Sequence, residues 1–376
     1  MNCDTQVAYL RATMARYYGP CGPCCQRLCP MLRKPSVEHR LNRNQGGLWI
    51  GVEWALCERP MSQTAAAIRA IHDLPVPELL YRAATAHRQH WNAEEIQFCT
   101  LDSIKTGACP EDCAYCPQSA RYQTSLKVEP LKDVAKVLAG AAEAKAAGST
   151  RYCMGAAWRE VKDDANFDAV LEMVQGVSGM GMEVCVTLGM LNEPQAKRLK
   201  AAGCQVYNHN IDSSRDFYET IISTRKFDER LETIAAVRAA GLEVCSGGIV
   251  GMGETIDQRI HFLQELTELE PAPESIPINQ FVAVDGTPLA DVDPLPPLEL
   301  VRMIAAARIL FPKSRIRLSA GRAQMSDELQ ALCFFAGANS IFTGEKLLTT
   351  PGPGLDHDQW LLQSLGMRVE GAAVRA

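Results

Sequence analysis

Three closely spaced cysteines are the clearest sign of chemistry in this sequence. Cys109, Cys113 and Cys116 form a CxxxCxxC pattern within KTGACPEDCAYCPQS. Three thiolates in one short loop can bind three corners of a cubane iron–sulfur cluster, and no fourth ligand follows nearby, so one iron would stay open. A structural zinc site is the alternative, but such sites have four ligands, and His87 and His90 upstream lack zinc-type spacing.

Three further cysteines occur singly in predicted strands. Cys153 lies in RYCMGAAW, Cys185 in MEVCVTLG and Cys245 in EVCSGGIV. A lone cysteine in a strand is most often a small buried hydrophobic residue. Three of them on different strands, facing the same interior as Arg317, instead indicate a second ligand set. A two-iron cluster needs about four protein ligands, so three thiolates leave one position to fill.

Helices alternate with these strands from about residue 64 onward. Several predicted helices end in Ala-Gly just before the next strand, and glycine is the usual residue after a helix end. Strands that each follow a helix indicate βαβ units and a parallel sheet. Eight such units predict an α/β protein with a (β/α)8 TIM-type barrel rather than a doubly wound sheet. We expect the strands to begin near Phe98, Thr150, Glu183, Gln205, Glu243, Ile278, Arg315 and Asn339.

Side-chain alternation along the strands predicts an unusual barrel interior. In MEVCVTLG, Val184, Val186 and Leu188 share one face, whereas Cys185 and Thr187 point to the other. RIRLSAG and QVYNHNID divide in a similar way. An ordinary barrel fills its interior with Val, Ile and Leu. We therefore expect the polar faces to line a lumen that holds ligands, rather than to lie at strand ends in solvent.

The composition sets the broad class of protein. The chain has 376 residues, 47% hydrophobic and 22% charged, enough to bury a large core. A net charge of −6 argues against nucleic-acid binding, and no apolar run is long enough for a membrane span. Fifteen cysteines in a large chain without a secretory-type signal favour metal, cluster or redox chemistry over disulfides.

Residues 1–60 differ from the rest of the chain. Arg and Lys outnumber acidic residues there, and no sustained periodicity is visible. We expect a poorly structured or artefactual extension, with the natural start at Met61 and the barrel domain over residues 61–376. A mitochondrial targeting segment and an extra metal-binding arm are alternatives, and we assign no catalytic role to this part. Its six cysteines are Cys3, Cys21, Cys24, Cys25, Cys29 and Cys57.

Longer motifs give the sequence a family resemblance. CxxxCxxC with Tyr115 before its last cysteine is similar to the signature of the radical S-adenosylmethionine (SAM) enzymes. From about Val76 to Gly366 the chain resembles the biotin synthase family, and residues 1–60 fall outside this likeness. The matching blocks, in order, are LDSIKTGACPEDCAYCPQSARY, AGSTRYCMGAAWR, YNHNID, VCSGGIVGMGET, RLSAGR and AGANSIFTGEKLLTTPGPG.

The resemblance implies radical insertion of sulfur into dethiobiotin to give biotin. In such enzymes SAM chelates the open iron, and one electron from the cluster cleaves SAM. The resulting 5′-deoxyadenosyl radical abstracts hydrogen from the substrate. A [2Fe–2S] cluster is thought to donate the sulfur, and no catalytic acid or base is expected beyond the cluster ligands. The implied ligands are Cys109, Cys113 and Cys116 for a [4Fe–4S] cluster, and Cys153, Cys185, Cys245 and Arg317 for the [2Fe–2S] cluster.

The resemblance also indicates residues for substrate and cofactor. Asn210 and Asn279 are candidates for the ureido ring of dethiobiotin, because an amide offers both a donor and an acceptor. Asp212 suits the ribose of SAM, and Thr349 and Thr350 suit the substrate carboxylate. Each of these residue types is also common in ordinary loops near strand ends.

Other polar and sulfur-containing residues receive structural interpretations. Arg317 has an alternative role as a buried counter-charge, because a guanidinium normally has no free lone pair for iron. Cys99, Cys204 and Cys333 are predicted to be packing residues. His209 lies between two asparagines on the opposite strand face, which indicates a structural histidine rather than a base.

The partners follow from the same resemblance. We expect dethiobiotin as substrate, a flavodoxin-type electron donor, iron–sulfur assembly proteins, a homodimer and a cytoplasmic location. One alternative is another radical SAM enzyme on the same barrel with a single [4Fe–4S] cluster. A second is a non-catalytic iron or zinc protein that has kept only the fold, although the intact CxxxCxxC argues against it.

Overall fold

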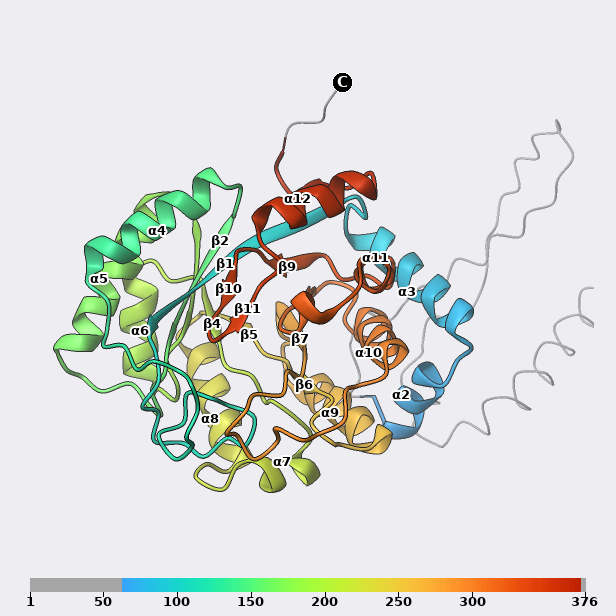
Figure 1. Ribbon diagram of the computed structural model, residues 1–376, viewed down its shortest axis with the longest axis horizontal. Helices are drawn as coiled ribbons and strands as arrows, with labels where there is room; N and C mark the ends of the chain where they lie inside the picture. The colour runs from blue at the N-terminus through green and yellow to red at the C-terminus, as the bar shows by residue number, and fades with distance from the viewer. Residues whose placement is uncertain (1–62, 373–376) are drawn as a thin grey trace, which may run out of the picture. The chain divides into compact units, whose positions relative to one another are not determined.

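Parallel strands alternate with helices along the described part of the chain, which comprises residues 63–372 of the computed structural model (Figure 1). The predictions for residues 1–60 therefore lie outside the described residues. The strands of the main sheet are β1 (Glu95–Lys105), β2 (Arg151–Ala156), β3 (Glu183–Thr187), β4 (Val206–Asn208), β5 (Glu243–Cys245), β6 (Gly248–Val250), β7 (Ser275–Gln280), β8 (Arg315–Leu318), β9 (Ser340–Phe342) and β12 (Arg368–Val369).

The sheet closes into the predicted barrel. Its order is β1-β2-β3-β4-β5-β7-β8-β9, and β9 pairs with β1 to close the circle of eight parallel strands. The short β6 follows β5 and pairs with β7, so the two share one position. β1 and β7 begin at Glu95 and Ser275, three residues earlier than Phe98 and Ile278. For β1 the reason is β12, whose Arg368 pairs with Glu95 from a distant part of the sequence.

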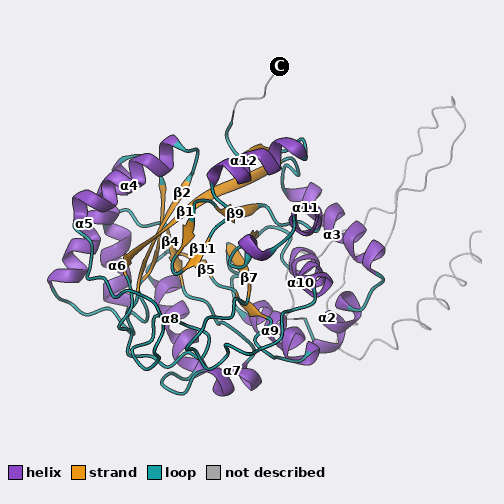
Figure 2. Cartoon of the chain, viewed as in Figure 1, coloured by secondary structure: helices purple, strands orange, loops and turns teal. Residues whose placement is uncertain are grey.

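Helices surround the barrel, and Figure 2 shows them outside the strands. No helix within residues 63–372 is both long and apolar enough to cross a membrane. The helices are α2 (Ala65–His72), α3 (Val76–His90), α4 (Val134–Ala146), α5 (Ala165–Gly179), α6 (Glu193–Ala201), α7 (Arg215–Ile221), α8 (Phe227–Ala239), α9 (Ile256–Glu268), α10 (Pro297–Leu310), α11 (Asp327–Phe335) and α12 (Leu355–Ser364), with a 3₁₀ turn η2 (Arg322–Gln324) and a hairpin of β10 (Lys346–Leu347) and β11 (Thr350–Pro351).

Local sequence explains where several helices begin and end. The Asn192 side chain accepts from the backbone N–H of Gln195, whose own side chain accepts from the Asn192 N–H, and this capping box starts α6. The turn after α6 passes through Gly203 at φ 100°, a left-handed conformation that glycine adopts without steric cost. After α6 the chain therefore returns promptly to β4.

The core separates into an apolar outer layer and a polar lumen. Val184, Val186 and Leu188 are fully buried in the hydrophobic layer between strands and helices. At the opposite face, Arg151 and Glu183 form an ion pair with an Nε–Oε2 distance of 2.5 Å beneath the cysteines. The predicted alternation is therefore confirmed for β3, and the interior of this barrel is built for polar groups.

A buried ion pair attaches the last helix to the barrel. Arg322 donates to both carboxylate oxygens of Asp358 on α12, to Gln330 Oε1 on α11 at 3.0 Å, and to the carbonyl of Phe342 at 2.9 Å. Asp358 has no solvent exposure. Loss of its carboxylate would leave the Arg322 charge buried without its main partner.

We expect Asp358→Ala to lower the free energy of unfolding by about 3–5 kcal/mol, as for other broken buried ion pairs. Denaturant titration of the metal-free chain measures this change. The matched control is Asp356→Ala on the same helix, whose side chain is exposed and should change stability by less than about 1 kcal/mol. Equal losses in the two variants would contradict the assignment.

Candidate active site

A single cavity gathers most of the residues singled out by the sequence. Its volume is about 340 Å³, and its walls come from the barrel strands, the three-cysteine loop and the β10–β11 hairpin. Cys245 does not border the cavity and instead contacts residues that do. The predicted site residues in the wall are Cys109, Cys113, Cys116, Cys153, Cys185, Asn210, Asp212, Asn279, Arg317, Thr349 and Thr350.

Backbone hydrogen bonds shape the three-cysteine loop. The Cys109 N–H donates to the carbonyl of Gln118 at 2.9 Å, and the Cys116 N–H donates to that of Cys113 at 2.9 Å. The chain enters the loop through Gly107 and Ala108, both with positive φ, and only glycine adopts this conformation without cost. The loop is therefore folded tightly enough to hold its thiols on one side, toward the cavity.

Burial controls the protonation of these thiols. Burial raises the pKa of Cys116 to about 12, and it raises the pKa values of Cys109 and Cys113 as well. Without a metal each thiol keeps its proton, and ligation to iron would displace it. Among the described residues, no three His, Cys, Asp or Glu side chains are arranged to hold a single metal ion.

Two acidic residues inside the loop tie it to the segment before α8, a feature that the sequence analysis missed. Asp112 accepts from the backbone N–H groups of Ser223 at 3.0 Å and Thr224 at 3.1 Å, and from the hydroxyl groups of both residues. Glu111 accepts from Thr224 Oγ1 at 2.5 Å and pairs with Arg159 and Arg225. The acidic pair in CPEDC was the available signal, but its partners lie 48 residues away at Arg159 and more than a hundred residues away at Ser223, Thr224 and Arg225.

The strand cysteines gather around one guanidinium deeper in the lumen. Cys153, Cys185 and Cys245 are almost fully buried and share an apolar surrounding of Val206, Leu101 and Phe342. Cys245 Sγ lies 3.7 Å from Nη1 of Arg317 and 3.2 Å from Nδ2 of Asn208. The sequence-predicted ligand set therefore converges in space, from β2, β3, β5 and β8.

Cys99 departs from its predicted packing role. Its Sγ lies 3.4 Å from Nη2 of Arg317, inside the lumen, whereas Cys204 and Cys333 are buried in the outer hydrophobic layer. Burial alone would lower the pKa of Arg317, but the neighbouring thiols, Cys99 first among them, outweigh burial and raise it. A cysteine sulfur therefore lies beside each terminal nitrogen of the guanidinium.

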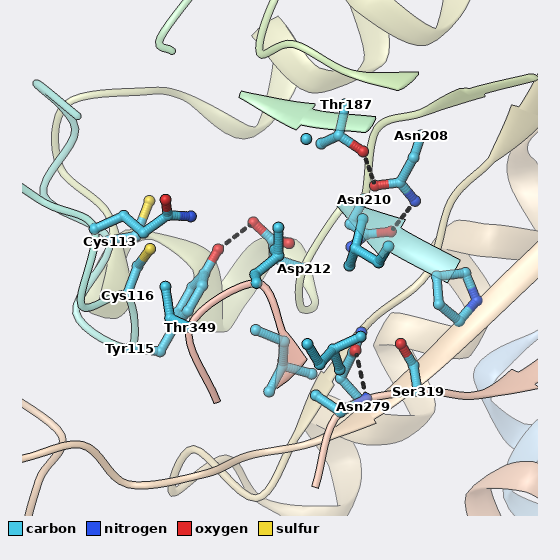
Figure 3. Close-up of a pocket in the computed structure, with 18 of the residues that line it drawn as sticks. Cys113, Tyr115, Cys116, Thr187, Asn208, Asn210, Asp212, Asn279, Ser319 and Thr349 are labelled. Atoms are coloured by element: carbon cyan, nitrogen blue, oxygen red, sulfur yellow. Dashed lines mark hydrogen bonds between the residues drawn. The ribbon is translucent and has the colours of Figure 1, made fainter. Parts of the chain in front are cut away.

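A polar chain runs from the three-cysteine loop into the lumen (Figure 3). The Tyr115 hydroxyl donates to Asp212 Oδ2 at 2.6 Å, and Arg230 pairs with the same carboxylate. Asp212 has a φ of 67°, unusual for a residue other than glycine, which directs its carboxylate into the cavity wall. Asn210 lies two residues before it and accepts from Asn208 Nδ2 at 3.2 Å.

The remaining predicted contacts also line the cavity. Asn279 donates to the carbonyl of Gly248 at 2.9 Å and accepts from the N–H of Ala320 at 3.1 Å, so its amide is fixed in one orientation. Thr349 and Thr350 border the cavity from the β10–β11 hairpin. These residues come from different elements and still face a common space.

His209 borders the cavity as well, although the alternation predicts that it points away. Its Nε2 is buried and has no hydrogen-bond partner among the described residues. Burial, with the charges of Arg230 and Arg225, holds its pKa far below the usual value, so the ring is neutral. β4 ends at Asn208, so His209 lies outside the strand and strict alternation no longer applies to it.

Known proteins and protein-family models match this chain over most of its length. The family model described as "Radical SAM superfamily" matches residues 103–266, and "Biotin and Thiamin Synthesis associated domain" matches residues 277–368. Biotin synthase of Methylobacterium radiotolerans is 60% identical over 314 residues, which cover 83% of this chain and 93% of that protein. Biotin synthase of Gloeobacter violaceus is 56% identical over 312 residues, covering 83% and 98%.

The chain belongs to the biotin synthase family. It is thereby also a member of the radical SAM superfamily, and the described barrel is the fold of that superfamily. Among solved structures, the [FeFe]-hydrogenase maturase HydG from Carboxydothermus hydrogenoformans matches with a TM-score of 0.71 at 13% identity, over 84% of this chain and 77% of that one. Methylornithine synthase matches with a TM-score of 0.68 at 17% identity, over 82% and 94%. These two likenesses concern the fold alone.

Family membership implies two iron–sulfur clusters, and the donor sets fit them. Three thiols on one tight loop match a cubane that keeps one iron free of protein ligands. The buried strand thiols lie together in the lumen beside Arg317, where they would supply thiolates to a second, smaller cluster. Both matched domains contribute residues to this site. Arg317 and the hairpin lie within residues 277–368, and the cysteines of both sets lie within residues 103–266.

The hydrogen bonds to Asp112 give the loop a pH-dependent stability. Burial alone would raise the pKa of Asp112, but the bonds from Ser223 and Thr224 outweigh it and lower the pKa from 3.8 to about 2. A depressed carboxyl pKa stabilises the folded state above the unfolded pKa, and this contribution fades as the pH falls toward the folded value.

We therefore expect the stability difference between the wild type and Asp112→Asn to be largest above pH 4 and to shrink between about pH 4 and pH 2. Denaturant unfolding of the metal-free chains across this range measures it. Glu160→Gln is the control, because the Glu160 side chain is exposed and should leave the difference small at every pH. A constant difference for Asp112→Asn would contradict the expectation.

Proposed function

We propose that this chain is a sulfurtransferase that converts dethiobiotin to biotin, using SAM, a [4Fe–4S] cluster and a [2Fe–2S] cluster. The observation that carries the proposal is the convergence of two cysteine sets around one cavity. The loop set lines it, Cys153, Cys185 and Arg317 line it deeper in the lumen, and Cys245 lies directly behind Arg317's Nη1. A radical enzyme with one cluster would need only the first set.

The chain's residues would hold each group in a defined place. Cys109, Cys113 and Cys116 would ligate the [4Fe–4S] cluster, while Cys153, Cys185, Cys245 and Arg317 would ligate the [2Fe–2S] cluster. When bound, the clusters and SAM supply the radical hydrogen abstraction and the sulfur atom. The polar chain and the hairpin then determine how substrate and cofactor lie between the two sets.

Asp212 is well suited to orient the ribose of SAM. Its carboxylate is fixed by the Tyr115 hydroxyl at 2.6 Å and by Arg230, so it presents its remaining lone pairs without rotating. Because Tyr115 belongs to the three-cysteine loop, the same bond sets the spacing between the loop and the ribose site. An acceptor positioned in advance costs no ordering entropy when the ligand arrives.

Asn210, Asn279, Thr349 and Thr350 are the proposed contacts of dethiobiotin. Asn279 is held by two backbone bonds yet keeps one N–H and one lone pair for the ureido ring. The two threonines on the hairpin would accept or donate at the carboxylate end. The hairpin covers one side of the cavity and would help to exclude water from reactive species.

We also propose the partners that this chemistry requires. A flavodoxin-type protein would supply electrons, and iron–sulfur assembly proteins would rebuild the sulfide consumed in each turnover. A homodimer and a cytoplasmic location complete the proposal. The alternative hypothesis is a radical enzyme with a single [4Fe–4S] cluster. The following experiment distinguishes it from the two-cluster proposal.

Anaerobic reconstitution with iron and sulfide, followed by Mössbauer spectroscopy, tests the two-cluster assignment. We expect two cluster species in the wild type and only the [4Fe–4S] species in Cys185→Ala, because this variant loses a thiol of the deep set alone. Cys109→Ala is the complementary variant and should lose the [4Fe–4S] species and SAM cleavage. A single [4Fe–4S] species in both wild type and Cys185→Ala would overturn the proposal and favour the one-cluster enzyme.

A further inference from the structure

Cys99 on β1 is a fourth lumen cysteine beside the deep ligand set. The two terminal nitrogens of the Arg317 guanidinium each contact a cysteine, Nη2 with Cys99 Sγ at 3.4 Å and Nη1 with Cys245 Sγ at 3.7 Å. Cys99 is completely buried, so its thiol has no solvent to turn toward. The guanidinium thus lies between one proposed ligand and one cysteine without an assigned role.

Cys99 and Arg317 are held by a shared set of polar groups. Ser340 Oγ accepts from Arg317 Nε at 3.0 Å and lies 3.5 Å from Cys99 Sγ. Cys99 Sγ also lies 3.4 Å from Gln97 Oε1, and Ser340 Oγ donates to that same oxygen at 3.0 Å. The thiol and the guanidinium therefore belong to one network of polar contacts beside the deep cysteines.

The ligand chemistry favours sulfur over the guanidinium. Iron in [2Fe–2S] clusters usually has four cysteine thiolates in total, and three thiolates leave one position for Arg317. A guanidinium is protonated and has no acceptor lone pair, so it must lose a proton to bind iron. A thiolate is the softer and more usual ligand, and Cys99 places one at van der Waals distance from the guanidinium.

We propose that Cys99 is an alternative fourth ligand of the [2Fe–2S] cluster and exchanges with Arg317 at the same iron. The proposal rests on the function proposed above. In the exchange the iron–nitrogen bond to Arg317 breaks and an iron–sulfur bond to Cys99 forms. The thiol proton passes to the guanidine nitrogen, so the total charge is unchanged and no oxidant or reductant is required.

Cluster content in Arg317 variants tests the exchange. After anaerobic reconstitution of the full chain, we expect Arg317→Met to keep its [2Fe–2S] cluster, with Mössbauer and resonance Raman spectra shifted toward four-thiolate ligation. Arg317→Met/Cys99→Ser should lose most of that cluster. The matched control is Arg317→Met/Cys333→Ser, because Cys333 is equally buried but belongs to α11, outside the lumen. It should keep the cluster.

Equal [2Fe–2S] content and identical spectra in Arg317→Met and in its Cys99→Ser derivative would overturn the proposal. So would complete loss of the cluster in Arg317→Met while its [4Fe–4S] cluster persists. If Arg317→Met loses both clusters, the fold has failed, and Arg317→Gln replaces it in the same comparison. A wild type without any [2Fe–2S] species would instead refute the proposed function, so the two failures are distinguishable.

Discussion

Buried guanidinium groups are the constraint on which this barrel depends. A charge removed from water must be paired and hydrogen-bonded, or its desolvation outweighs what the fold can supply. The lumen meets this requirement at several depths: Arg151 pairs with Glu183 near the base, Arg317 bonds to Ser340 among the cysteines, and Arg230 pairs with Asp212 near the mouth. Each pairing also fixes the side chains that border the cavity.

The same requirement explains why the site is rigid before any ligand arrives. Asp212 cannot swing away from Arg230 without leaving two opposite charges unpaired, and Tyr115 joins this pair to the three-cysteine loop. The loop is held from its other side by Glu111 and Asp112. Polar networks of this kind are stable when every member is satisfied, and they specify one geometry for the residues they contain.

The sequence predicts those features of the fold and site that depend on short-range periodicity. The period of two along β3 and β8 places Cys185 and Arg317 in the lumen, and the helix-end glycines locate the eight strands. Contacts between distant segments are not encoded in local periodicity. The extension of β1 depends on Arg368, and the bond between Asp112 and Ser223 spans the chain from β1 to α8.

Cys99 illustrates a second limit of predicting structure from side-chain periodicity. Alternation along β1 allows an inward side chain at this position, but it does not reveal which residue lies beside it once the barrel closes. That neighbour is Arg317, more than two hundred residues later. Conversely, the candidate substrate and cofactor residues could be named only because long motifs resemble a family, since Asn and Thr near strand ends are ordinary loop residues.

The attachment of the three-cysteine loop to Ser223 and Thr224 also bears on how the protein is made. During synthesis a chain emerges from its N-terminus, and the loop precedes its anchor by more than a hundred residues. The loop therefore reaches its final conformation only after α7 has left the ribosome. The deep set is completed later still, because Arg317 and Ser340 come from the last two strands to close the barrel. Neither cysteine set therefore reaches its final surroundings until most of the chain has been translated.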